Sequence, residues 1–185
     1  ILRKAIEAEK TIFKNTSGVD SAISAYGGFL SYDTNNGFQE LSLKNNFDLI
    51  ITNSEQIHNT EQMVNQVKKF KEQNEKQFKE LCSREDQIIK EALPALRENN
   101  LGKIGALMLE NQNLLEQIGV STKKITSLIN ESRKTSYGSK LTGAGGGGCI
   151  ISLVDKNNRE TTLDNLNRLG DSFVAKIDHG GVDYT

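Results

Sequence analysis

The sequence predicts an α+β fold in which helices pack against a mostly antiparallel sheet. Two short apolar stretches, at residues 29–32 and 47–52, have the length and composition of buried strands. Longer stretches between residues 61 and 132 carry apolar residues at helical spacing. A glycine-rich turn at residues 143–148 separates two further strand-like segments and favours a hairpin, which joins antiparallel strands.

The start of the chain predicts two helices and a strand. Residues 1–14 place apolar side chains among charged ones with helical periodicity. A turn is expected at residues 15–18, followed by a short helical piece from about Asp20 to Ala25. The apolar strand at residues 29–32 comes next.

The middle of the chain is predicted to be mainly helical. After the strand at residues 47–52, Asn59 and Thr60 can cap one long helix over residues 61–82. Two further helices are expected on either side of "ENNLG" at residues 98–102, with the only proline, Pro94, near the end of the first. Another helix runs toward Ser132 from a cap at Ser121 or Thr122.

The last fifty residues predict the hairpin and a closing α/β segment. Residues 139–142 and the apolar run at residues 149–154 are the expected hairpin strands. A helix is expected near residues 160–170, and strands at residues 173–177 and 182–184.

Composition excludes several classes of protein. The 185 residues suffice for one good core, or for one domain and part of another. The 23 basic and 24 acidic residues are well mixed, which argues against a nucleic-acid partner. No apolar run approaches the roughly 18 residues of a membrane span, and no signal peptide is recognisable at the start. Cys82 and Cys149 lack metal-ligand spacing, so we expect a reducing, cytoplasmic setting.

The glycine run at residues 143–148 is the first candidate for function. It contains five glycines and Ala144, and it continues directly into an apolar strand, unlike a flexible linker. Residues without a Cβ can turn successive N–H groups toward one anion, which is how phosphate-binding nests form. The tip of an ordinary hairpin that needs unusual φ values explains the same run, and the glycines alone leave both interpretations open.

Four segments, one of which contains the glycine run, bring a family into view. "NTSGVDSAISAYGG" at residues 15–28 and "KLTGAGGGGC" at residues 140–149 resemble motifs of the GHMP superfamily of galactose, homoserine, mevalonate and phosphomevalonate kinases. Within it they are most similar to the mevalonate kinases. "IGALMLENQNLLEQIGVST" at residues 104–122 resembles the family's helical segment ahead of the glycine-rich loop, and "HGGVDY" at residues 179–184 resembles its usual end, so the motifs occur in the family's order.

The resemblance implies an organisation and an activity. Residues 1–32 correspond to a remnant of the family's N-terminal lobe, and residues 33–185 to the GHMP kinase C-terminal domain. The implied reaction phosphorylates mevalonate to 5-phosphomevalonate with ATP and Mg²⁺, a step of isoprenoid and sterol precursor synthesis. The family's ATP loop and first lysine have no counterpart here, so we expect the missing N-terminal half as a partner and no activity from these residues alone. The resemblance leaves a homodimer open.

The resemblance also implies residue roles. Asp20 matches the catalytic aspartate, although an Asp after a glycine turn is otherwise expected to be a helix N-cap. Glu9 matches the glutamate that binds Mg²⁺, although an exposed helical Glu is normally a solvated side chain. The motifs place the following residues at the substrate or the phosphates: Ser17, Gly18, Thr60, Gly143, Ala144, Gly145, Gly146 and Gly147.

Two features leave alternatives. Thr60 can equally be a helix cap, and Thr16 stands where the family usually has proline, which loosens the turn before Asp20. A phosphomevalonate kinase is the nearest alternative enzyme, but its loop typically has an acidic residue where this chain has Gly148. A catalytically silent relative that serves as a sensor or binding module is the alternative from another class. The presence of both Asp20 and Glu9 argues against it.

Overall fold

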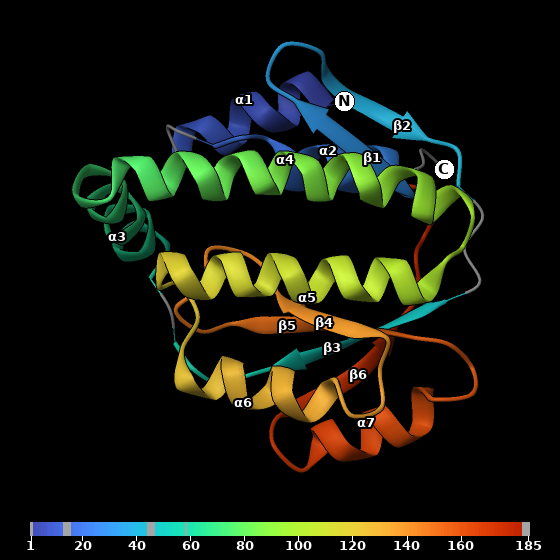
Figure 1. Cartoon of the computed structure of the whole chain (residues 1–185). Helices are drawn as coiled ribbons and strands as arrows, with labels where there is room; N and C mark the ends of the chain where they lie inside the picture. The colour runs from blue at the N-terminus through green and yellow to red at the C-terminus, as the bar shows by residue number, and fades with distance from the viewer. Residues whose placement is uncertain (1, 13–15, 44–46, 58, 183–185) are drawn as a thin grey trace. The chain divides into compact units, whose positions relative to one another are not determined.

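The computed structural model describes residues 2–12, 16–43, 47–57 and 59–182 (Figure 1). The chain forms two compact units. The first unit comprises residues 1–44 and 176–185, and the second unit comprises residues 45–175. Both contain helices and antiparallel strands, so the predicted α+β class is confirmed.

The first unit contains two helices and a two-stranded sheet. Its elements are α1 (Leu2–Ile12), α2 (Val19–Tyr26), β1 (Phe29–Asp33) and β2 (Gly37–Leu41). The predicted helices and the strand β1 are confirmed, whereas β2 was not predicted. It pairs with β1 across a turn in which Asp33 Oδ1 accepts the N–H groups of Asn35, at 2.9 Å, and Asn36, at 3.0 Å.

The C-terminal segment of the first unit packs against the end of α2. The N–H of Gly28 donates to the carbonyl of Asp178 at 2.6 Å. A Cβ on Gly27 would lie 2.4 Å from the N atom of Gly181, so the two backbones approach as only glycine allows. Val182 is not in a strand, contrary to the prediction for residues 182–184, of which the last two lie outside the described residues.

A four-stranded antiparallel sheet forms the centre of the second unit. It contains β3 (Asp48–Asn53), β4 (Gly138–Leu141), β5 (Cys149–Val154) and β6 (Asp171–Ala175), in the order β4-β5-β3-β6. Ile50 and Ile150 are fully buried under α6 and α7, with Leu128 and Leu166 from those helices. The predicted hairpin is therefore present, as β4 and β5.

Five helices complete the described part of the second unit. They are α3 (Thr60–Gln73), α4 (Glu75–Arg97), α5 (Leu101–Ile118), α6 (Lys123–Ser132) and α7 (Arg159–Asn167). The single helix predicted over residues 61–82 is wrong, because Asn74 leaves the helical region with φ −135° and ψ 48°. Its side-chain Nδ2 donates to the carbonyl of Phe70 at 3.2 Å, a local bond that competes with helical hydrogen bonding.

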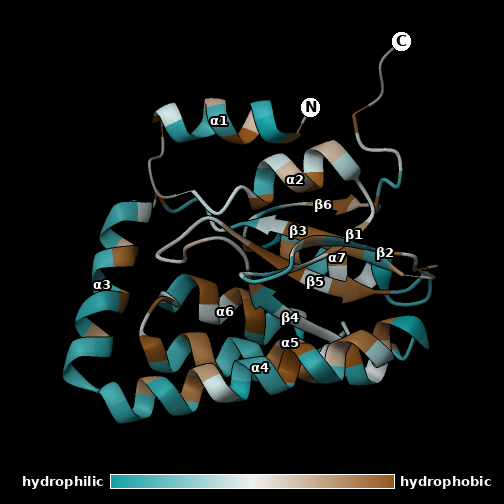
Figure 2. Ribbon diagram, turned by 90° about the horizontal axis from the view of Figure 1, so that it is seen from above, coloured by the Kyte–Doolittle hydropathy of each residue, from teal (hydrophilic) through white to brown (hydrophobic). Residues whose placement is uncertain are grey.

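The helices α4 and α5 lie side by side and are joined by apolar and polar contacts. Leu81 and Ile88 of α4 pack with Leu107 and Leu114 of α5. Across the same pair Arg84 donates two hydrogen bonds to Glu110, one of them Nη2 to Oε2 at 2.7 Å. In Figure 2 the strands of the second unit are largely apolar, whereas α3 is mostly hydrophilic.

The helix α5 also rests directly on the sheet. A Cβ on Gly105 would lie 2.0 Å from the carbonyl oxygen of Tyr137, and one on Gly138 would lie 2.1 Å from the carbonyl oxygen of Gly105. The backbones of α5 and β4 thus touch at a point where neither can carry a side chain. Thr122 caps α6 by accepting the N–H of Ile125 at 3.2 Å, which confirms one of the two predicted caps.

Candidate functional site

The side chain of Glu9 is held by two hydroxyl groups in the first unit. Thr16 Oγ1 donates to Glu9 Oε1, and Ser21 Oγ donates to Glu9 Oε2 at 2.7 Å. Thr16 Oγ1 also accepts the N–H of Gly18 at 3.0 Å. The two hydroxyl bonds, that of Thr16 first, lower the pKa of Glu9 against a smaller opposite effect of desolvation. Glu9 is therefore an oriented carboxylate and not a merely solvated side chain.

Asp20 lies in the first turn of α2. The N-cap of that helix is Gly18, at φ 74°, so the interpretation of Asp20 as the N-cap is wrong. The Asp20 side chain is exposed and makes no hydrogen bond within the described part of the chain. A carboxylate there interacts favourably with the positive end of the helix dipole.

Gly18 brings α1 and α2 close together. A Cβ on Gly18 would lie 2.9 Å from Cδ1 of Ile6. Ser17 Oγ accepts the N–H of Val19 at 3.5 Å, at the long end of a hydrogen bond. The first unit thus brings together four of the predicted site residues, Glu9, Ser17, Gly18 and Asp20.

Glu9 fits a single ligand position for Mg²⁺. Among the described residues there is no group of three or more side chains of the kinds His, Cys, Asp and Glu that could hold a metal ion together. Mg²⁺ is usually bound by one or two carboxylates, with phosphate oxygens and water completing its six ligands. A carboxylate oxygen has two lone pairs, so the bonds from Thr16 and Ser21 leave each Glu9 oxygen able to accept another contact.

The glycine loop, residues 143–148, lies in the second unit and is shaped by contacts with three other segments. A Cβ on Gly145 would lie 2.4 Å from the carbonyl oxygen of Val120, and one on Gly147 would lie 2.6 Å from that of Gln56. One on Gly146 would lie 2.6 Å from Sδ of Met63. Contacts within the chain itself therefore require glycine at these three positions.

The N–H groups of the glycine loop fall into two sets. That of Gly146 donates to Val120 at 2.8 Å and that of Gly148 to Gln56 at 3.3 Å, so both are occupied. Within the described residues, the remaining N–H groups make no hydrogen bond: those of Gly143, Ala144, Gly145 and Gly147. All the glycines of the loop have φ between 73° and 149°. The loop is thus an anchored hairpin tip that also has free N–H donors. Its six N–H groups do not all form one anion-binding nest, because those of Gly146 and Gly148 are already hydrogen-bonded within the chain.

Thr60 is the first residue of α3 and is exposed. Asn59 is the cap of that helix, since its side chain accepts the N–H of Gln62 at 3.0 Å, so Thr60 is not the capping residue. Thr60 lies in the second unit with the glycine loop, and the loop contacts α3 through Met63.

Neither cysteine forms a disulfide within the described residues. Cys149 is half-buried, and Cys82 is exposed.

Two residues of this site were not found by sequence reasoning. Thr16 was noted only as a departure from proline, and Ser21 was not considered. Their roles depend on α1 and α2 packing so that two hydroxyl groups reach the same carboxylate. A pattern of Glu9 followed by hydroxyl residues seven and twelve positions later does not indicate this by itself.

Comparison with known proteins identifies the fold. Residues 92–172 match the family described as GHMP kinases C terminal. The chain thus carries a GHMP kinase C-terminal domain. It is 34% identical over 166 residues to a mevalonate kinase of Methanocaldococcus jannaschii, covering 86% of this chain and 50% of that protein. It is 30% identical over 173 residues to a mevalonate kinase of Thermococcus onnurineus, covering 90% and 51%.

Solved structures of GHMP kinases agree. The chain matches L. major mevalonate kinase, solved in complex with R-mevalonate, with a TM-score of 0.84 and 27% identity over 91% of this chain and 54% of that one. It matches Methanococcus jannaschii mevalonate kinase with a TM-score of 0.80 and 30% identity, over 92% and 53%. The resemblance to mevalonate kinases is confirmed, and the chain spans about half the length of the relatives it matches.

Within the described residues, every helix is too short or too polar to cross a membrane.

Proposed function

We propose that this GHMP kinase domain is part of an enzyme that phosphorylates mevalonate to 5-phosphomevalonate with ATP. The observation that carries the proposal is the similarity to mevalonate kinases over about nine tenths of the chain. Structural similarity alone would support only the fold, since a Streptococcus pneumoniae phosphomevalonate kinase matches with a TM-score of 0.64 at 20% identity.

Asp20 is the proposed catalytic carboxylate. Phosphoryl transfer has a loose transition state, so the enzyme mainly positions the attacking hydroxyl and stabilises charge. Asp20 is exposed and free of competing hydrogen bonds within the described residues, so its carboxylate is available to orient that hydroxyl and accept its proton.

Glu9 is the proposed protein ligand of Mg²⁺. The ion would neutralise the phosphate charge when it is bound with ATP. Thr16 and Ser21 fix the orientation of the carboxylate and favour its ionised form, which is the form that binds a cation. Glu9 then needs little reorganisation when the ion arrives.

Substrate and phosphate contacts are proposed for the remaining motif residues. Ser17 and Gly18 precede Asp20, and Thr60 begins α3. In the glycine loop the free N–H groups of Gly143, Ala144, Gly145 and Gly147 are the proposed donors to oxygen atoms of substrate or phosphate. A cytoplasmic location, an N-terminal half as partner and a homodimer belong to the same proposal.

The first experiment tests the reaction. The 185-residue chain is assayed for mevalonate-dependent ADP release, first alone and then mixed with a second polypeptide. This second polypeptide is the half of the Thermococcus onnurineus mevalonate kinase to which the chain does not align. We expect activity only in the mixture. ADP release with phosphomevalonate in place of mevalonate would favour the alternative kinase, and a mixture that binds ATP without turnover would favour the silent module.

The second experiment tests Asp20 in the active mixture. Asp20→Asn keeps the size and removes the charge, so turnover should fall by about 10² or more, the usual scale for a general base. Asp164→Asn, which changes an exposed aspartate on α7 in the same way, is the control and should leave turnover unchanged. Near wild-type turnover in Asp20→Asn would remove the catalytic role.

A further inference from the structure

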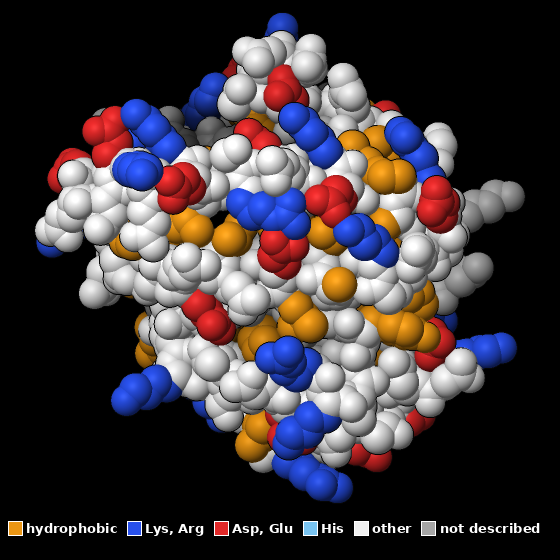
Figure 3. Space-filling view, in the orientation of Figure 1, with side chains coloured by type: hydrophobic (Ala, Val, Ile, Leu, Met, Phe, Trp, Pro, Cys, Tyr) orange, Lys and Arg blue, Asp and Glu red, His pale blue; other side chains and the backbone are white. Residues whose placement is uncertain are grey.

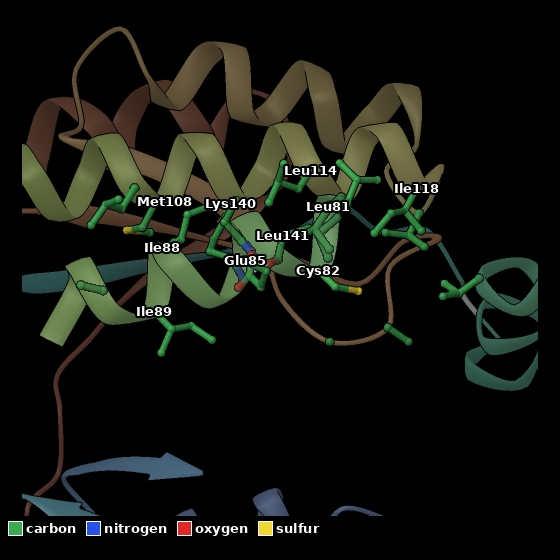
Figure 4. Close-up of a pocket in the computed structure, with 18 of the residues that line it drawn as sticks. Leu81, Cys82, Glu85, Ile88, Ile89, Met108, Leu114, Ile118, Lys140 and Leu141 are labelled. Atoms are coloured by element: carbon green, nitrogen blue, oxygen red, sulfur yellow. Dashed lines mark hydrogen bonds between the residues drawn. The ribbon is translucent and has the colours of Figure 1, made fainter. Parts of the chain in front are cut away.

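A cavity of about 600 Å³ lies between α4 and α5 in the second unit, and the start of the glycine loop closes one end of it (Figure 4). Ligand pockets in proteins commonly have volumes of about 300–1,000 Å³ and mainly apolar walls. The walls here are built largely from six side chains of the two helices, Leu81, Ile88, Leu107, Met108, Leu114 and Ile118. The cavity therefore has the size and the character of a small-molecule site.

The cavity is open to solvent along its rim. Ile89, one of its lining residues, is 51% exposed, and Cys82, another lining residue of α4, is also exposed. Figure 3 shows hydrophobic side chains at the surface along the line between α4 and α5, with charged side chains among them. Apolar surface that remains hydrated is unfavourable, and a ligand that displaced this water would gain the corresponding free energy.

Three polar side chains also line the cavity. Asn111 Nδ2 donates to Glu85 Oε2, and Lys140 Nζ donates to the carbonyl of Leu141 at 3.0 Å. Asn111 is 7% exposed, and its Oδ1 has no hydrogen-bond partner within the described part of the chain. Burial lowers the pKa of Lys140, and the nearby charge of Glu85 opposes that shift.

These polar groups select a chemistry. Glu85 and Lys140 carry opposite charges, so a ligand with a net charge would be attracted by one and repelled by the other. Asn111 Oδ1 has no donor among the described residues, and the Lys140 ammonium has three N–H groups, of which the Leu141 carbonyl accepts one. A hydroxyl group both donates and accepts, so it can serve both side chains.

We propose that this cavity binds an uncharged, mainly hydrocarbon molecule that carries a hydroxyl group. The hydrocarbon part lies against the apolar side chains of α4 and α5, and the hydroxyl group lies at Asn111 and Lys140. Gly143 and Ala144 line the same cavity, so the ligand also contacts the start of the glycine loop. The inference rests on the second unit alone and does not depend on the proposed kinase reaction.

The test uses the full 185-residue chain and a fluorescent probe. Nile red is uncharged and fluoresces in apolar surroundings, and it should bind saturably. Decanol should then displace it at a concentration at least about tenfold lower than decanoate or decylammonium, the equivalent of about 1.4 kcal/mol in binding free energy. Absence of saturable binding would overturn the proposal, and so would equal displacement by the alcohol and the two ions.

Variants locate the binding. Ile89→Glu places a charge on the rim and should weaken Nile red binding, whereas Val64→Glu changes a similarly exposed apolar residue of α3 outside the cavity and should not. Unchanged binding in Ile89→Glu would place the probe elsewhere and overturn the proposal.

A second pair of variants tests the hydroxyl site. Asn111→Leu should bind Nile red but lose the preference for decanol. Lys140→Met serves the same purpose if circular dichroism shows that Asn111→Leu does not fold. A preference that survives in the folded variant would contradict the assigned hydroxyl site.

Discussion

Two loops that carry predicted site residues are held in shape by opposite means. Before α2, residues 16–18 are fixed by side chains, since the Thr16 hydroxyl bonds both Glu9 and the N–H of Gly18. In the glycine loop the shape depends on missing side chains, because the backbone of Val120 and that of Gln56 occupy the space where a Cβ would be. A substitution that removes the Thr16 hydroxyl would therefore disturb the first loop by the loss of hydrogen bonds. A substitution that adds a side chain would disturb the glycine loop by a steric clash with the backbone of Val120 or Gln56.

The largest effect is expected from Gly145→Ala. The new Cβ would lie 2.4 Å from the carbonyl oxygen of Val120, and the residue would have to keep a φ of 83°. Overpacking and left-handed backbone strain together should reduce the free energy of unfolding by about 3 kcal/mol. Urea unfolding followed by circular dichroism measures this. A loss below about 1 kcal/mol would mean that the loop yields easily and that the contrast is wrong.

A smaller loss is expected from Gly143→Ala in the same loop. Gly143 also has a positive φ, of 78°, but among the described residues, apart from its two chain neighbours, no atom lies within 4 Å of the position of its Cβ. Only the backbone strain remains, so the free energy of unfolding should fall by about 1 kcal/mol. The same urea measurement compares the two variants directly. Equal losses would show that φ, and not the close approach of Val120, determines the need for glycine.

The smallest effect on stability is expected at the other loop, where the pKa of Glu9 is the sensitive quantity. Thr16→Val removes the larger of the two hydroxyl bonds, so the pKa of Glu9 should rise, and Ser21→Ala should raise it less. Thr16→Ser keeps the hydroxyl and should keep the low pKa. A carboxyl-carbon NMR titration measures each value, and the same pKa in Thr16→Val as in the wild type would contradict the prediction.

The sign of the accompanying pH dependence follows from the lowered pKa. Glu9 takes up a proton less readily in the folded state than in the unfolded state. The stability that the ionised Glu9 contributes is therefore present above the pKa of the unfolded state and is lost as the pH falls through the pKa of the folded state. Thr16→Val should therefore lose less stability on acidification than the wild type. Thermal unfolding from neutral to acidic pH compares the two proteins, and parallel curves would contradict the sign.

Local patterns predicted most elements, and non-local contacts explain what was missed. The apolar runs of β3 and β5 indicated strands because both are buried in the sheet. The strand β2 has a mixed pattern and becomes recognisable only as the partner of β1. The break at Asn74 was missed since helical periodicity continues through it and the competing hydrogen bond involves a single side chain.

In the candidate site, too, local sequence patterns predicted some features, and non-local contacts determine the rest. The resemblance predicts roles for Glu9 and Asp20, but the hydroxyl bonds to Glu9 depend on the packing of α1 against α2 at Gly18 and could not be predicted from it. The glycine run was recognised as unusual, but the reason for Gly145 and Gly147 lies in segments far away in sequence, at Val120 and Gln56. Spacing along the chain carries no information about such approaches.

The backbone contact between α5 and β4 determines which wall of the cavity can move. At Gly105 and Gly138 no side chain lies between the helix and the strand. A shift of α5 against β4 therefore cannot be accommodated there by a change of side-chain rotamers. The helix α4 makes no such contact among the described glycines and is joined to α5 by side chains, including the ion pair of Arg84 with Glu110. We therefore expect that a larger ligand would widen the cavity by displacing α4, while α5 keeps its place on the sheet.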